Sequence, residues 1–577
     1  MNPISSMRRD RSGNVAMMFG LLLPVVIVTA GMAVDTANVE GAKWSMQRSV
    51  DAAALGAAKE YGRTQDPAEL ERWAKALFFS NEGHDASDNT VFTYQGVSRV
   101  DGNNVLSVKA TRDEPTFFGS AVKLVTKGKV NLETWRLEVT SEVVVSNRSI
   151  ELALVLDNSG SMNNPPLGGV TPKITTLRDA SQKLVEQMLA PQPLANSKDP
   201  VRISVVPFAA SVNVGAKSPP PSWMDTAGLS PSNHDDFDWK VPGLTLPTSK
   251  FTIFTKLGLR NSNWKWKGCV QSRPSGYAIT DDAPTVIDPA TLFVPFLAPS
   301  EYNWGGTLVS QKNDYLPISA YANDNDALRA QRDITRYLNA TAYADFNTDK
   351  GPNRGCTTAA ITPLTATQST AVAAVQGMIA SGGTNIAEGL AWGWRTLTSG
   401  EPFSEGRARG TKDNLKVIVL MTDGENTYNA SYTNGDQIEL TNANRSQFGT
   451  YGYGQFMETK SGVEKIRTGR MFDATKATTP RANISSITAA MNETMSLTCE
   501  NIKKDGTNDD GGDGVVIFSI AFDLKDGSPI KERLRACASN GIDGKGAKLY
   551  YDAKNSNDLL RAFATITDEI SALRIAR

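Results

Sequence analysis

The first strong pattern along the chain is an apolar segment near its start. Residues 15–34 (VAMMFGLLLPVVIVTAGMAV) contain no charged side chain, and about 20 helical residues cross the ~30 Å hydrocarbon core of a bilayer. Three arginines precede this segment, and Asp35 and Glu40 follow it. The pattern predicts a single-pass helix in the inner (cytoplasmic) membrane, with residues 1–14 in the cytoplasm and the bulk of the chain in the periplasm. A signal peptide cleaved near VTAGMA is the alternative.

Residues 35–147 predict a helical stalk followed by a small α+β region. Residues 35–62 continue as a helix whose apolar stripe packs on partner helices, or as a simple stalk helix. The stripe consists of Val39, Ala42, Met46, Val50, Ala53 and Ala57. A second amphipathic helix and a short helix are expected at 66–85 and 116–124, and three alternating or β-branched segments predict strands at 90–97, 104–111 and 135–145.

From Ser149 onward, buried strands alternate with helices, which is typical of a parallel sheet in an α/β fold. Continuous apolar runs predict strands buried on both faces. The expected strands are 150–156, 201–208, 415–423 and 515–522, with a short one at 547–553. The expected helices are 173–189, 369–380, 385–397 and 557–575. These elements predict a doubly wound domain built from residues 148–210, 363–424 and 486–577.

Two polar stretches interrupt this domain, at 211–362 and 425–485. The first holds half of the chain's ten tryptophans, and we expect it to fold as a subdomain with the indoles in its core rather than on a binding surface. They are Trp223, Trp239, Trp264, Trp266 and Trp304. The acidic run 503–514 is expected to be a solvated loop, since its best calcium-loop register places Ile520 where Glu is required.

Composition narrows the function classes. The chain has 577 residues and a formal net charge of −1, so no basic field for nucleic acid is visible. It contains only two histidines, which argues against a histidine zinc site and most His-based acid–base chemistry. No nucleophile–base pair or phosphate loop is visible, and we therefore predict no catalysis.

Four cysteines, none in a CxxC pair, fit two disulfides in an oxidising compartment. Three pairings are possible. We favour Cys269–Cys356 and Cys499–Cys537, because each pair closes a loop within one region of the chain. Four free buried thiols are the alternative.

Hydroxyl and carboxylate side chains follow the carboxyl ends of the predicted strands. Asp157, Ser159 and Ser161 follow strand 150–156, Thr384 lies just before helix 385–397, and Asp423 ends strand 415–423. Because ligands of wound sheets bind at this edge, we expect the five side chains to meet there. Oxygen ligands without His or Cys suit a hard divalent cation, Mg²⁺ first and Ca²⁺ or Mn²⁺ as alternatives. A plain capping role for Asp157 is the competing interpretation.

Two resemblances to known families extend these predictions. RSGNVAMMFGLLLPVVIVTAGMAVD followed by QRSVDAAALGAA resembles the N-terminal segment of TadG-like proteins of the tight-adherence (Flp pilus) system. Met18 stands where a cleaved prepilin carries Glu, so the resemblance does not extend to prepilin processing. DNSGSM, GGTNIAEGL and VLMTDGEN, in this order, resemble the metal-ion-dependent adhesion site of von Willebrand factor A domains.

The second resemblance implies that the hydroxyls bind the metal directly, that the carboxylates bind mostly through water, and that a partner protein donates an acidic side chain. Together the two resemblances imply metal-dependent protein contact in the assembly or anchoring of a Flp pilus, with pilus or Tad components as partners. The alternatives are a surface adhesin that binds host or substratum directly, a cytoplasmic metal-insertion factor, and a scaffold that binds no metal.

Overall fold

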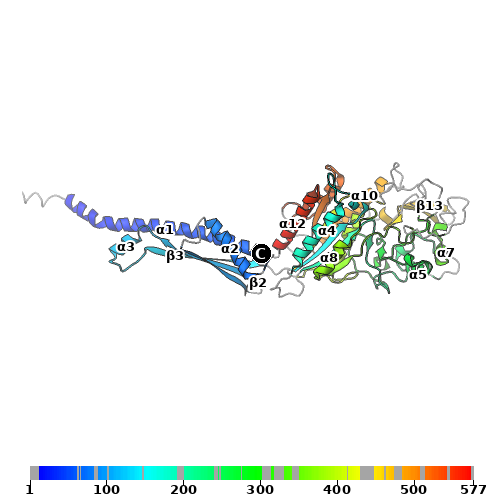
Figure 1. Ribbon diagram of the computed structural model, residues 1–577, viewed down its shortest axis with the longest axis horizontal. Helices are drawn as coiled ribbons and strands as arrows, with labels where there is room; N and C mark the ends of the chain where they lie inside the picture. The colour runs from blue at the N-terminus through cyan, green and yellow to red at the C-terminus, as the bar shows by residue number, and fades with distance from the viewer. Residues whose placement is uncertain are drawn as a thin grey trace, which may run out of the picture. The chain divides into compact units, whose positions relative to one another are not determined.

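The computed structural model describes most of the chain. The described residues are 12–61, 64, 66–82, 89–100, 103–145, 149–190, 201–239, 245, 248–274, 276–301, 313–316, 330–340, 350–411, 414–428, 448–460, 463–468, 470–472, 484–506, 514–541 and 546–573. The chain divides into two compact units (Figure 1). Residues 1–148, 191–196 and 569–577 form the first unit, and residues 149–190 and 197–568 form the second.

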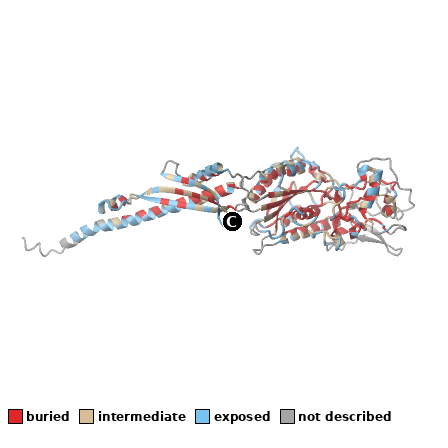
Figure 2. Cartoon of the chain, turned by 90° about the horizontal axis from the view of Figure 1, so that it is seen from below, coloured by how far each residue is buried: buried red, intermediate tan, exposed pale blue. Residues whose placement is uncertain are grey.

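The first unit is built on α1 (Ser12–Tyr61), a continuous helix of 50 residues. At 1.5 Å per residue it is about 75 Å long. Within the described part of the chain it is the one helix long and apolar enough to cross a membrane, and almost none of its most apolar stretch is buried. Figure 2 shows this change along α1, from exposed near its start to buried on one side further on. The predicted long helix, running from the apolar segment into the stalk, is confirmed.

The buried side of α1 packs on a small antiparallel sheet. The sheet has the order β1-β2-β3, formed by β1 (Thr90–Val100), β2 (Asn103–Pro115) and β3 (Thr134–Val145), and α2 (Pro67–Glu82) and α3 (Gly119–Val125) complete the unit. Val39, Met46 and Val50 share a core with Leu106 and Leu137. The apolar stripe thus covers the chain's own sheet, and the expectation that it packs on partner helices is wrong.

The second unit contains a mixed sheet with the strand order β15-β14-β9-β4-β5-β6-β7, and β8 pairs with β5. Neighbouring strands from β15 to β5 run parallel, whereas β6, β7 and β8 run antiparallel to their partners. The strands are β4 (Ser149–Asp157), β5 (Val201–Phe208), β6 (Val212–Asn213), β7 (Cys269–Val270), β8 (Thr362–Thr365), β9 (Asn414–Thr422), β14 (Val515–Phe522) and β15 (Tyr550–Ala553). The predicted α/β class is confirmed. The antiparallel strands β6 and β7 come from the insertion that follows β5, and β8 begins where that insertion ends.

Helices accompany this sheet. They are α4 (Lys173–Met188), α8 (Gln368–Gln376), α9 (Ile386–Thr396), α10 (Ile484–Lys504), α11 (Pro529–Cys537) and α12 (Ser556–Leu573). Helix α4 contacts α8, and the hydroxyls of Thr176 and Ser556, 3.1 Å apart, join α4 to α12 (Figure 1). Helix α9 lies close on β4 and β5, because a Cβ at Gly393 would come within 2.4 Å of Val155. The sequence pattern did not predict α10.

Of the two insertions, the first joins the second unit's core, and the second packs through Tyr451, Met471 and Phe472 in a separate apolar cluster with α10. Their elements are α5 (Lys250–Arg260), α7 (Ile334–Leu338), β10 (Phe448–Gly449), β11 (Gly452–Tyr453), β12 (Gln455–Lys460) and β13 (Val463–Thr468). Trp223, Trp239, Trp264 and Trp266 are buried in the core cluster that contains Val155 and Phe208 of the sheet. The predicted core role of the tryptophans is confirmed for these four, and Trp304 lies outside the described residues. The insertions also contact each other, since the Ser272 N–H donates to the Thr450 carbonyl oxygen at 2.9 Å.

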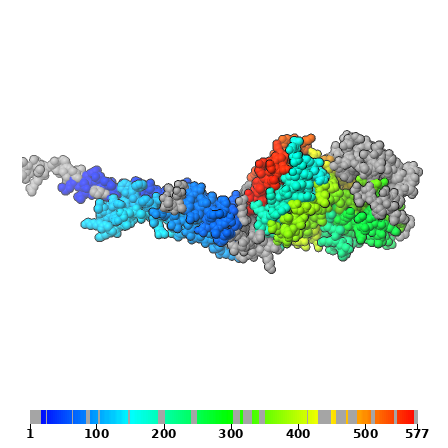
Figure 3. All heavy atoms as spheres, in the orientation of Figure 1, coloured from blue at the N-terminus to red at the C-terminus, as the bar shows by residue number. Residues whose placement is uncertain are grey.

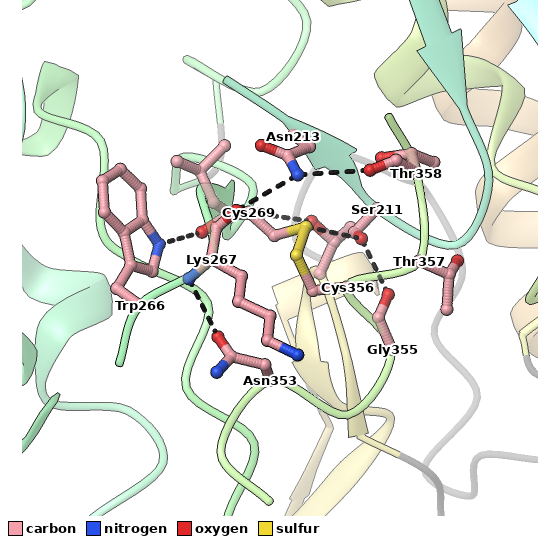
Figure 4. Close-up of a disulfide and its surroundings, with 12 residues drawn as sticks. Ser211, Asn213, Trp266, Lys267, Cys269, Asn353, Gly355, Cys356, Thr357 and Thr358 are labelled. Carbon is pink, nitrogen blue, oxygen red and sulfur yellow. Dashed lines mark hydrogen bonds between the residues drawn. A yellow bond between two sulfur atoms is a disulfide. The ribbon is translucent and has the colours of Figure 1, made fainter. Parts of the chain in front are cut away.

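Both predicted disulfides are confirmed: Cys269–Cys356 and Cys499–Cys537. Figure 4 shows the first, surrounded by hydrogen bonds between segments of the first insertion. Ser211 donates to the Gly355 carbonyl oxygen at 2.8 Å, and the Trp266 indole donates to the Cys269 carbonyl oxygen at 2.7 Å. The second bridge joins α10 to the end of α11. Of the acidic run, residues 507–513 lie outside the described residues.

Candidate metal site

The candidate ligands gather at the carboxyl edge of the parallel strands. Asp157 is the last residue of β4, and Asp423 directly follows β9. The two strands are parallel neighbours, so their carboxyl ends meet at one edge. Thr384 lies two residues before α9, and a hydrogen bond of 2.8 Å from Gly160 N to the Gly382 carbonyl oxygen joins the turn after β4 to the turn before α9.

The oxygen atoms of these side chains form a connected cluster. The Ser159 and Ser161 hydroxyl oxygens are 3.0 Å apart, and Ser161 donates to Oδ1 of Asp423 at 2.6 Å. A Cβ placed at Gly424 would lie 3.7 Å from the Thr384 hydroxyl and 3.9 Å from the Ser161 hydroxyl, so both hydroxyls face Gly424. Within the described part of the chain, the Thr384 hydroxyl has no hydrogen-bond partner.

Asp157 holds the turn and belongs to the cluster as well. Its Oδ1 accepts from the Ser159 N–H at 2.8 Å, which is the local turn bond that a capping role predicts. Its Oδ2 accepts from the Thr422 hydroxyl at 2.6 Å, which links it to the end of β9. Capping and ligand roles are therefore compatible for this side chain.

The donor set fits a small divalent cation. Oxygens bound to Mg²⁺ at 2.0–2.1 Å in an octahedron lie about 2.9 Å apart, and the Ser159–Ser161 and Ser161–Asp423 oxygen pairs are separated by 3.0 and 2.6 Å. Burial, and after it the charge of Asp423, raises the pKa of Asp157 to about 7. A divalent cation would offset the cost of two neighbouring buried carboxylates. No group of three or more His, Cys, Asp or Glu side chains able to hold a metal occurs among the described residues, and this cluster has two such side chains and three hydroxyls.

Lys173 is a member of the site that the sequence pattern did not predict. This first residue of α4 is only 7% exposed, and its ammonium donates to Oδ2 of Asp423 at 2.9 Å. It also pairs with Asp523 at 3.1 Å. Although burial alone would lower it, the two carboxylates raise the pKa of Lys173 above its ordinary value.

Asp523 could have been found from the sequence. It directly follows β14, a buried strand parallel to β9, so it stands at the same edge as Asp157 and Asp423. Its backbone has a positive φ of 52°, and its Oδ1 accepts from the Leu167 N–H at 3.1 Å. A cavity of about 520 Å³ opens beside it, lined by residues 523–529 and Glu425.

The comparison with protein families gives a match for the N-terminal segment. A family model for Flp pilus-assembly TadE/G-like proteins matches residues 13–60, the region of α1. The match is confined to the helix that is long and apolar enough to cross a membrane. No curated protein matches the chain.

Solved structures that resemble the chain include pilus proteins. The PilB minor pilin of Streptococcus sanguinis is 12% identical, with 85% of this chain and 80% of that chain covered and a TM-score of 0.28. The von Willebrand factor domain of the type V pilus tip protein Mfa5 of Porphyromonas gingivalis is 12% identical, with 74% and 96% covered and a TM-score of 0.31. Scores of this size do not establish a shared fold.

Proposed function

We propose that the chain is a membrane-anchored component of Flp/Tad pilus assembly or anchoring, whose second unit makes a metal-dependent contact with a partner protein. The pilus role rests on the family match over residues 13–60. The metal-dependent contact rests on one observation, the meeting of Asp157, Ser161 and Asp423 at the carboxyl edge of β4 and β9.

The second unit, in this proposal, is a von Willebrand A domain with two large insertions. The parallel order β14-β9-β4-β5 and the oxygen cluster at its carboxyl edge support this assignment. Ser159, Ser161 and Thr384 would hold the ion through their hydroxyls, and the two aspartates would bind mostly through water. Mg²⁺ is the expected ion, with Ca²⁺ or Mn²⁺ as alternatives. Its chemistry here is to attract an oxygen ligand, and no catalytic step is assigned.

The proposed partner supplies an acidic side chain to the ion. Two site carboxylates roughly neutralise a divalent ion, which therefore stays able to accept a further carboxylate. Pilus or Tad components are the expected partners. Nucleic acid is not expected, since the chain's formal net charge is −1.

A pull-down tests the metal-dependent contact. The full-length protein, solubilised from membranes, is used to capture partners in Mg²⁺ and in EDTA, beside an Asp157→Asn variant. We expect recovery of the partner to fall in EDTA and in the variant to a similar extent. Equal recovery in all three samples would reject the metal-dependent contact.

Fractionation tests the location. An anchor in the inner membrane with a periplasmic second unit predicts recovery in that membrane, and digestion by protease only after the outer membrane is opened. Recovery on the cell exterior would favour the surface adhesin instead.

A further inference from the structure

The connection between β2 and β3 lies against the end of the apolar segment of α1. It covers residues 116–133 and contains α3. A Cβ built at Gly31 would lie 2.4 Å from Cγ of Phe118, so this ring rests directly on the backbone of α1. In Figure 3 the light-blue segment around α3 lies against the dark-blue α1. The contact falls within the last turn of the uncharged stretch, which ends at Val34.

Asp35 also holds this connection against α1, one helical turn after Gly31. Its Oδ1 accepts from the Phe117 N–H at 2.7 Å, and its Oδ2 accepts from the Phe118 N–H at 2.9 Å. The carboxylate is only 5% exposed. Gly31 and Asp35 are one helical turn apart, about 6 Å along the axis, so two contacts set the height of α3 beside α1.

Large apolar side chains of this connection are exposed. Phe117 and Leu124 are 77% and 80% exposed, and Val125 and Val130 are 54% and 42% exposed. Four such residues within 14 positions form an apolar surface that water solvates poorly. Exposed Lys127 and Lys129 are interspersed with them.

We propose that residues 116–132 form an interfacial segment, which inserts its apolar side chains into the surface of the bilayer that α1 crosses. The inference rests on the proposed membrane anchor. A helix of about 20 residues fills the hydrocarbon core, and the headgroup layer adds about 5–8 Å on each side. Side chains held level with Gly31 and Asp35 therefore lie at the boundary between acyl chains and headgroups.

The charges of the segment suit this position. Apolar side chains at the boundary enter the lipid, while lysines extend their ammonium groups to the phosphates. Lys127 and Lys129 would be attracted to an anionic lipid surface. A second attachment beside α1 would limit the tilt of the stalk relative to the membrane.

Spin labels on the full-length protein test this inference. The four cysteines form disulfides, so single cysteines introduced by Leu124→Cys or Phe117→Cys can be labelled selectively. The protein is placed in nanodiscs with or without phosphatidylglycerol. Accessibility to oxygen and to a water-soluble nickel chelate is then measured. Val100→Cys is the matched control. Val100 is 49% exposed and ends β1 at the end of the sheet that is remote from α3. Val26→Cys reports on α1 itself.

We expect labels at 117 and 124 to be several-fold less accessible to nickel than the label at 100, and more so with phosphatidylglycerol. If the label at 26 is protected while the label at 124 is as exposed as that at 100, the interfacial segment is wrong and the anchor stands. If the label at 26 is also water-exposed, the anchor itself is wrong. Equal protection with and without phosphatidylglycerol would overturn the role given to the lysines.

Discussion

Ser161 donates a hydrogen bond of 2.6 Å to Asp423, which lies 262 positions further along the chain. The bond joins the turn after β4 to the end of β9. Within its own segment Ser161 contacts the Ser159 hydroxyl at 3.0 Å, and it is the folded sheet that brings Asp423 to these two hydroxyls. The oxygen cluster therefore exists only in the assembled sheet, and any ion bound there stabilises the fold of the second unit by mass action.

Removal of divalent metal should destabilise the parent protein. At an ion concentration 100 times Kd, binding to the folded state adds about 2.7 kcal/mol. We expect EDTA to lower the unfolding temperature of the parent and to leave that of Asp157→Asn unchanged, as measured by calorimetry in Mg²⁺ and in EDTA. Asp179→Asn, an exposed position on α4, is the control and should respond like the parent. A parent that unfolds at the same temperature in both buffers would contradict the metal site.

Lys173 should weaken metal binding. Its ammonium bonds to Asp423 and adds a positive charge beside the ion. We expect Lys173→Met to bind Mn²⁺ about tenfold more tightly, which corresponds to about 1.4 kcal/mol, in a calorimetric titration. Asp523→Asn should weaken Mn²⁺ binding, because the Lys173 ammonium loses its second carboxylate and then pairs with Asp423 alone. Weaker binding by Lys173→Met would mean that the lysine chiefly orients Asp423.

The positions of Asp157 and Asp423 could be predicted because buried strands are continuous apolar runs whose carboxyl ends meet in a parallel sheet. That of Thr384 followed from the predicted helix that it precedes. Lys173 could not be predicted, since a lysine at the start of an amphipathic helix is ordinarily solvated. Its burial depends on Asp523, which β14 brings from 350 positions away in the sequence.

The insertions were the least predictable region. The tryptophans of the first insertion were expected in a core, but that core is shared with the sheet through long-range packing that no local pattern encodes. Helix α10 was missed because its sequence, ISSITAAMNETMSLTCENIKK, is rich in Ser, Thr and Asn, which are moderate helix formers. The bridge from Cys499 to Cys537 and contacts with α9 hold it in place.

The buried Lys250–Asp236 pair should be required for the stability of the first insertion. Lys250 is fully buried and uses its three N–H groups on Asp236, Gln271 and the Ser232 carbonyl oxygen, at 2.8, 2.6 and 3.3 Å. Lys250→Met would leave a buried carboxylate without its cation, at a cost of about 3–5 kcal/mol. Thermal unfolding of the variant should show this loss.

Two further variants separate charge from packing at this pair. Lys250→Met combined with Asp236→Asn should recover part of the stability, because no unpaired charge remains. Lys256→Met, at an exposed position of the same helix, should be nearly neutral. If the single and double variants lose equal stability, the unpaired charge is not the cause of the destabilisation.

The contact between Gly31 and Phe118 should control the attachment of α3 to α1. Leucine at position 31 cannot fit against a ring 2.4 Å from its Cβ, so Phe118 must move and the bonds from Phe117 and Phe118 to Asp35 must lengthen or break. We expect the amides of both phenylalanines in Gly31→Leu to exchange hydrogen about tenfold faster, equivalent to about 1.4 kcal/mol of lost protection. Exchange mass spectrometry on the full chain in nanodiscs measures this. Gly20→Leu is the matched control, because the space around Gly20 is open and exchange should not change. Equal exchange in the two variants would mean that the ring contact does not hold α3 in place.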